Sequence, residues 1–149
     1  MGYTWVMARS NTRFAVAVHL LTLLADAPGE TLGSQFLAIS PATNPVHVRR
    51  VLGQLREKGL VLSRPGVHGG WTLARAPEEI DLGEVWRAVN GEDALLGIHV
   101  PDPNCQTGQL VSANLLALDR RAFDVLVDEL GRVTVADVLA GAVAAEMTP

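Results

Sequence analysis

Residues 44–75, NPVHVRRVLGQLREKGLVLSRPGVHGGWTLAR, decide the fold of this 149-residue chain. Asn44 is a preferred helix N-cap, and Pro45 suits the first helical position because its missing N–H needs no partner there. Apolar residues then recur along one stripe of the segment, and Gly59 can end it in a left-handed conformation. The pattern predicts an amphipathic helix between Asn44 and Gly59.

A β-hairpin is predicted directly after this helix. Residues 60–64 and 71–75 have the composition of two short strands, and residues 65–70 form a glycine-rich turn between them. Two further helices are expected before residue 44. The first is capped by Ser10 and ends at residues 27–29, and its inward-facing residues are Phe14, Ala17, Val18, Leu21 and Leu24. The second spans residues 31–39, and its inward-facing residues are Leu32, Phe36 and Leu37. Three helices followed by a hairpin are the elements of a winged helix-turn-helix.

The C-terminal half is predicted to be helical around an irregular centre. Asp81 can cap a helix that ends at residues 90–91, and a long helix is expected from about Gly108 to Gly131. The long helix carries two apolar stripes, of which one would pack on its own domain and the other on a second copy of the chain. Alternatively, a last helix over residues 134–145 covers both stripes.

These elements define the expected fold class, which is mainly α with a small β-hairpin, a winged helix-turn-helix plus a long C-terminal dimerisation helix. The expected domain boundaries lie where the predicted helices are interrupted by residues that break regular structure. Residues 8–90 form the DNA-binding domain with its following helix, residues 91–107 an irregular sensor-like loop, and residues 108–149 the dimerisation helix and the closing helix.

Composition excludes several classes of protein. Hydrophobic residues make up 48% of the chain and charged residues 19%, which is enough apolar material for a core and excludes intrinsic disorder. The longest apolar run, residues 14–25, is too short for a membrane span, and no secretory signal pattern precedes it. A cytoplasmic protein without membrane association is expected. The single cysteine, Cys105, excludes an intrachain disulfide framework.

Charge is distributed unevenly along the chain. The net charge is −4, but residues 1–75 carry eight basic and three acidic side chains, whereas residues 76–149 carry four and thirteen. A basic first half favours a polyanionic partner, double-stranded DNA. In a helix-turn-helix, the N-terminal half of the second helix reaches base edges and phosphates in the major groove. The predicted DNA-binding residues are Arg9, Arg13, Asn44, Val46, His47, Arg49, Arg50, Gln54, Arg64 and His68. No hydrolytic triad or phosphate-binding loop is present, so an enzyme is not expected.

The hairpin and its flanks resemble the BadM–Rrf family of bacterial winged-helix regulators. The residues that carry the resemblance are Lys58-Gly59-Leu60-Val61, Ser63, Gly66, Gly69-Gly70-Trp71-Thr72-Leu73-Ala74-Arg75, Pro77, Glu79-Ile80 and Leu82, within a span from about Met7 to Leu139. The resemblance implies a homodimer, joined through the long helix, that binds a partly palindromic operator, contacted by the wing as well as by the helix. The family usually has arginine directly before the first wing glycine; here that place holds Pro65, with Arg64 one step earlier.

The region before the long helix resembles a cluster-free, single-cysteine branch of the family. Cluster-binding members carry three cysteines there, whereas this chain has Cys105 alone, so no cofactor and no iron–sulfur cluster is expected. Near a helix N-terminus the dipole favours the reactive thiolate, which predicts Cys105 as an oxidant or electrophile sensor in a repressor. An inert, half-buried cysteine is the competing interpretation. The alternative functions are a protein-interaction module and a small-ligand-sensing dimer without thiol sensing.

Overall fold

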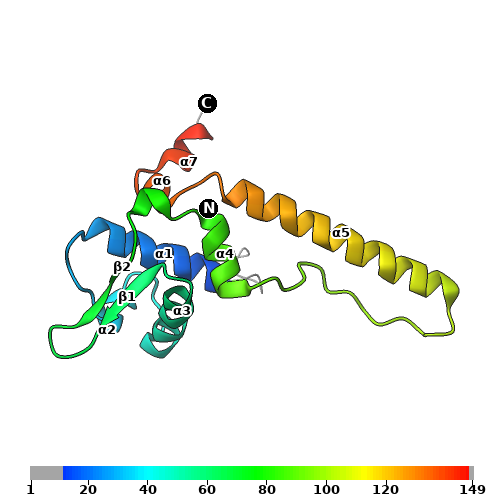
Figure 1. Ribbon diagram of the computed structural model, residues 1–149, viewed down its shortest axis with the longest axis horizontal. Coiled ribbons are helices and arrows are strands. Elements are labelled where there is room, and N and C mark those ends of the chain that lie inside the picture. The colour runs from blue at the N-terminus through cyan, green and yellow to red at the C-terminus, as the bar shows by residue number, and fades with distance from the viewer. Residues whose placement is uncertain (1–11, 148–149) are drawn as a thin grey trace.

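The computed structural model describes residues 12–147 as a helical body from which one long helix projects (Figure 1). The first part contains α1 (Thr12–Asp26), α2 (Ser34–Leu37), α3 (Pro45–Glu57) and the antiparallel strands β1 (Val61–Arg64) and β2 (Gly70–Leu73). The second part contains the 3₁₀ helix η2 (Pro77–Glu79), α4 (Leu82–Asn90), α5 (Gln106–Leu130), α6 (Val135–Leu139) and α7 (Ala142–Glu146). This order confirms a mainly α fold with a small hairpin, a winged helix-turn-helix followed by a long helix.

The core lies between α1, α3, α4 and the base of the hairpin. Leu21, Leu52 and Val85 are fully buried in it, together with the remaining aliphatic side chains on the inner faces of these helices. Each such side chain contributes about 1.5–3 kcal/mol when it is removed from water. Because α3 packs at once on α1, α2, α4 and β1, its orientation in the body is fixed by many of these contacts.

The second helix is much shorter than predicted because its first residues pair with the wing. Leu32 forms an antiparallel bridge with Trp71, in which both backbone N–H groups donate, at N···O distances of 3.0 and 2.9 Å. The helix therefore begins only at Ser34. Leu37 is buried as predicted, but Phe36 is 59% exposed, so its predicted inward position is wrong.

The first helix follows the predicted pattern with one shift. Ala17, Leu21 and Leu24 are buried, while Phe14 and Val18 are only half-buried. Phe14 instead meets the ring of Trp86 edge-on, with the ring centroids 5.1 Å apart. The predicted cap, Ser10, lies outside the described residues.

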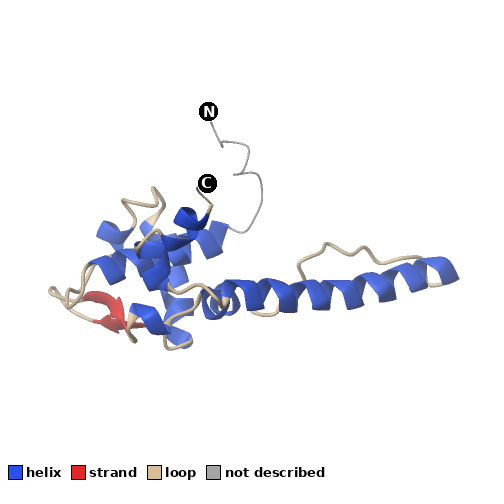
Figure 2. Ribbon diagram, turned by 90° about the horizontal axis from the view of Figure 1, so that it is seen from above, coloured by secondary structure: helices blue, strands red, loops and turns tan. Residues whose placement is uncertain are grey.

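The long helix α5 forms an arm whose N-terminal half lies beyond the body (Figures 1 and 2). Its 25 residues correspond to a length of about 37 Å. Near its C-terminal end Phe123 and Val127 are buried, where α5 packs on α4. Asp119 is 7% exposed, and its Oδ1 accepts the Leu96 N–H at 2.6 Å, which ties the loop between α4 and α5 to the arm. Large apolar side chains remain exposed on α5: Leu110, Val111, Leu116, Leu118 and Val125.

Residues 131–147, which follow α5, return to the body and do not cover the arm. The Leu82 N–H donates to Val133, and the Val135 N–H donates to Ile80, each at 2.9 Å. The predicted closing helix over residues 134–145 is two short helices, because Gly141 takes a left-handed φ of 70° between them. Of these, α6 packs on α1 and η2, so the alternative in which residues 134–145 cover both stripes of the long helix is wrong. Within residues 12–147, no helix combines the length and the apolarity that crossing a membrane requires.

Candidate nucleic-acid interface

The start of α3 is built from two neighbouring residues. The side chain of Asn44 accepts the Val46 N–H at 2.8 Å, and Pro45 occupies the first turn, as predicted. The helix therefore begins directly at this cap, and its first turn lies at the surface of the body. Its N-terminal backbone groups and the helix dipole favour a nearby anion.

Two opposite faces of α3 have different chemistry. The inner face carries Val48, Val51, Leu52 and Leu55, all of them fully buried. The outer face carries Val46, which is 55% exposed, and the exposed side chains of Arg49 and Arg50. We call Val46, Arg49 and Arg50 the reading face. Because the inner face is anchored in the core, the reading face is held toward solvent.

The arginines of α3 differ in their partners. Arg49 Nη1 donates to Ser34 Oγ of α2 at 3.3 Å, whereas Arg50 makes no hydrogen bond or ion pair with any residue of the described range 12–147. Arg56 is drawn to the wing: its Nη1 donates to Ser63 Oγ at 3.0 Å and its guanidinium lies over the Trp71 ring, 5.7 Å from the centroid. Arg50 is therefore available to an external anion, while Arg49 is oriented by α2.

The turn of the hairpin needs its paired glycines. A Cβ at Gly69 would collide with the carbonyl of Arg64, and one at Gly70 would lie 2.7 Å from the backbone of Leu32. The tip itself is open, since Val67 is 98% exposed and Arg64 and His68 are exposed on either side. The His68 carbonyl accepts the Thr31 hydroxyl at 3.1 Å, which holds the wing to the loop before α2.

The remaining predicted contact residues are hydrogen-bonded within the protein, half-buried or outside the described residues. Arg13 is exposed, but its Nη1 donates to the Val89 carbonyl in the last turn of α4, at 3.0 Å. His47 and Gln54 are half-buried, and the buried Oε1 of Gln54 accepts no hydrogen bond from any described residue. Arg9 lies outside the described residues. The structure thus gathers Asn44 and the reading face on one helix and places Arg64 and His68 on the wing beside it.

Ser34 and Arg56 are the residues that sequence reasoning missed. Ser34 orients Arg49 from another helix, and Arg56 joins α3 to the wing through Ser63 and Trp71. Both contacts depend on tertiary packing, so no local motif predicts them. An arginine three residues before Gly59 and an aromatic residue after paired glycines were the only available signals.

Cys105 is exposed and occupies the N-cap of α5. Its Sγ accepts the Gly108 N–H at 3.3 Å, so the thiol lies at the positive end of the helix dipole. Within residues 12–147, no group of three or more His, Cys, Asp or Glu side chains is placed to hold a metal ion. The one thiol of the whole chain does not match the usual cysteine ligation of iron–sulfur clusters.

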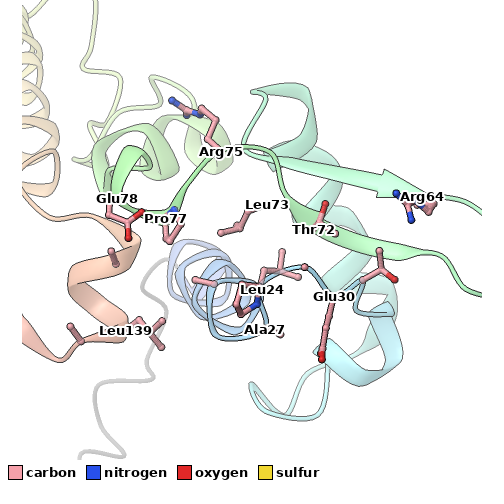
Figure 3. Close-up of a pocket in the computed structure, with 16 residues that line it drawn as sticks. Leu24, Ala27, Glu30, Arg64, Thr72, Leu73, Arg75, Pro77, Glu78 and Leu139 are labelled. Carbon is pink, nitrogen blue, oxygen red and sulfur yellow. The ribbon is translucent and has the colours of Figure 1, made fainter.

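A groove of about 800 Å³ lies between the wing base, the end of α1 and α6 (Figure 3). Leu24, Leu73 and Leu139 give it apolar walls, and Glu30 and Arg64 stand at its edge. Arg75, which also lines it, pairs with Glu84 at 3.0 Å. The groove is thus shared by the wing and by the segment that returns from the arm.

Similar proteins are found both by sequence and by structure. The sequence profile of the Rrf2 family, described as an iron-dependent transcriptional regulator, matches residues 10–141. YwnA of Bacillus subtilis, assigned by its name to the HTH-type transcriptional regulators, is 35% identical over 130 residues, which cover 87% of this chain and 96% of YwnA.

Solved structures are similar over most of the chain. A crystal structure described as that of a DNA-binding protein has a TM-score of 0.70 and 31% identity, covering 85% of this chain and 98% of the other. The structure of CymR of B. subtilis, described as the global cysteine regulator, has a TM-score of 0.64 and 21% sequence identity, and the match covers 90% of this chain and 98% of CymR. The second likeness concerns the fold alone.

Proposed function

Since this chain belongs to the Rrf2 family and is a DNA-binding transcription regulator rather than an enzyme, we propose that α3 reads its operator in the major groove. The observation that carries this proposal is the reading face, with Arg50 exposed and without a partner among the described residues. An arginine in this position can donate two hydrogen bonds to a guanine. Asn44 and His47 border the reading face at the helix start, and the wing residues Arg64 and His68 are proposed to contact the flanking backbone or minor groove.

The other predicted contacts have separate proposed roles. Gln54 lies one turn beyond Arg50 and could reach DNA only by leaving its half-buried position. Arg13, and Arg9 before it, are proposed to contact phosphates near the N-terminus of α1. Because operators lie in the cytoplasm, this is the proposed compartment. The proposed domain limits remain residues 8–90, 91–107 and 108–149.

We propose that the regulator acts as a homodimer joined along α5. The exposed apolar side chains of the arm support this assembly, because a partner arm would remove them from water. Two α3 helices related by a two-fold axis would then read a partly palindromic operator, with half-sites spaced by the dimer. Occupying such a site can block transcription, so the proposed sense of regulation is repression.

Salt dependence tests DNA binding directly. Lys and Arg contacts to phosphates release condensed counterions, so the affinity for duplex DNA should fall steeply as salt rises. Fluorescence anisotropy with a duplex selected by the protein from a random pool, titrated at several salt concentrations, measures this slope. A flat salt response, or no duplex bound at low salt, would contradict the proposal.

Cys105 is the proposed sensor, and the proposal needs no resident cofactor. Hydrogen peroxide would transfer one oxygen atom to the exposed Cys105 thiol, which gives a sulfenic acid and water. The new polar group would disturb the N-cap of α5, where Sγ accepts the Gly108 N–H. The change would thereby reach the dimer arm.

The Cys105→Ser variant separates sensing from DNA binding. Serine is a good N-cap, so this variant should keep the operator affinity of the wild type. Peroxide should weaken operator binding by the wild type only. The readout is anisotropy before and after peroxide, with the modification confirmed by intact-protein mass spectrometry. Equal responses of the two proteins, or none in the wild type, would refute the sensor.

A small-molecule effector is the second candidate function, and the groove in Figure 3 favours it. Its volume of about 800 Å³ falls in the usual range of ligand sites. Native mass spectrometry of the purified protein would detect a ligand retained there. Loss of that ligand in an Ala136→Trp variant, which fills the groove wall, would place the ligand in the groove.

A further inference from the structure

Gly53 is a glycine in the interior of α3 that the packing of the described chain does not require. A glycine at such a position destabilises a helix relative to alanine. A Cβ at Gly53 would meet no atom within 4 Å, and the backbone there is helical, with no positive φ. A methyl group at this position would therefore lie in open space.

The other helical glycines of the described range have clear reasons within the chain. A Cβ at Gly83 of α4 would lie 2.8 Å from the Val127 carbonyl oxygen, so this glycine permits α4 and α5 to pack closely. A Cβ at Gly108 of α5 would lie 2.9 Å from the Cβ of Pro101. Gly53 differs from both, because no atom of the described residues lies within 4 Å of the position that a Cβ would occupy.

The position of Gly53 on α3 indicates which molecule approaches it. Val46, Arg49, Arg50 and Gly53 are separated by steps of three, one and three residues, so they share one side of the helix, opposite Leu52 and Leu55. Gly53 lies about 10 Å along the helix axis from Val46. This distance slightly exceeds the depth of the major groove, about 8.5 Å. A helix whose N-terminal turn contacts the bases at the floor of the groove would therefore place Gly53 at about the level of the bordering strands.

We propose that Gly53 is the point at which the sugar–phosphate backbone of operator DNA comes closest to α3; this inference rests on the proposed function. The lack of a side chain lets the strand approach the helix, while Arg49 and Arg50 supply cations one turn earlier. Glu57 lies one turn further on the same side and is exposed. Its carboxylate repels phosphates, so the strand leaves the helix between Gly53 and Glu57.

Substitutions at Gly53 give this proposal a test in which stability and affinity change in opposite directions. Gly53→Ala and Gly53→Gln introduce better helix formers into open space, so each variant should melt at the same temperature as the wild type or higher. Both should bind the selected duplex more weakly. The expected rise in dissociation constant is about tenfold for Ala, the effect of one lost DNA contact, and larger for the longer Gln. Gly97→Ala is the matched control, because a Cβ there also meets no atom within 4 Å but lies in the loop before α5.

The outcomes distinguish the inference from the function on which it rests. Weaker binding by the two Gly53 variants, with melting temperatures at or above that of the wild type and an unaffected Gly97→Ala protein, supports the close approach. Wild-type affinity in the Gly53→Gln variant overturns the inference and leaves the proposed function intact. Failure of the wild type to bind any duplex at low salt overturns the proposed function together with the inference.

Discussion

Arg50 is the residue at which the chemistry of the reading face can be measured most directly. It is exposed and makes no hydrogen bond or ion pair within residues 12–147, so its removal should not disturb the fold. Arg50→Ala should weaken operator binding by about 1–3 kcal/mol, the value of a bidentate arginine–base contact. Fluorescence anisotropy against the selected operator measures the change.

A charge-matched variant controls for the general loss of one cation. Arg132 is exposed and forms an ion pair with Glu129, three residues before it, at 3.6 Å. Arg132→Ala therefore removes the same charge at a position far along the chain from α3. This control should bind almost as the wild type does. If the Arg50 and Arg132 variants lose equal affinity, Arg50 contributes only net charge and does not read the operator.

The elements that carry local signals could be predicted from the sequence. Asn44 and Pro45 start α3, Gly59 ends it with a φ of 72°, and the Asp81 side chain caps α4 by accepting the Glu84 N–H at 2.9 Å. The short α2 could not be predicted in the same way, because Leu32 is drawn into a bridge with Trp71, 39 positions later in the chain. Side-chain partners such as Ser34 for Arg49 likewise depend on packing between elements. The candidate site was therefore predictable as a helix with its cap and its cations, but its orienting contacts were not.

The connection between α4 and α5 depends on one buried carboxylate. Asp119 Oδ1 accepts the Leu96 N–H at 2.6 Å, and Asp119 is the buried charged residue of the described range. Asp119→Ala removes the carboxylate that accepts the Leu96 N–H, and a hydrogen bond to a charged group contributes about 1.5–3 kcal/mol, so the free energy of unfolding should fall by about this amount. Urea denaturation followed by circular dichroism measures this loss.

An isosteric variant separates the hydrogen bond from the charge. The amide of an asparagine at this position would retain an acceptor oxygen, so Asp119→Asn should lose less stability than Asp119→Ala. Hydrogen exchange at residues 91–105 should speed up in the alanine variant, because this contact holds the loop to the arm. Unchanged exchange in that loop would show that other contacts hold it in place.

At the scale of the whole molecule, the exposed apolar side chains of α5 predict a dimer, and a single charged substitution among them should disrupt it. Leu116 is 56% exposed on the projecting half of the arm. Leu116→Glu would place a carboxylate in the proposed apolar interface and should shift the protein toward monomer. Analytical ultracentrifugation measures the dissociation constant, and circular dichroism confirms the retained helix content.

A second glutamate variant serves as the control for assembly. Val143 on α7 is 41% exposed and lies off the arm. Val143→Glu should therefore assemble as the wild type does. A monomeric wild type, or a Leu116→Glu variant that dimerises with unchanged affinity, would exclude an interface along this part of α5.

The backbone of residues 133–135, which follow α5, pairs with that of residues 80–82 at the start of α4, and this pairing joins the C-terminal base of the arm to the body. Because of this pairing, the arm and the winged domain should move together as one rigid unit. A tilt of roughly 10° over about 37 Å displaces the far end by about 6 Å, which exceeds one base-pair rise of about 3.4 Å. A small rotation between the arms of the two subunits of the proposed dimer is thus enough to change the spacing of the two α3 helices, so that they no longer match the two half-sites of the operator.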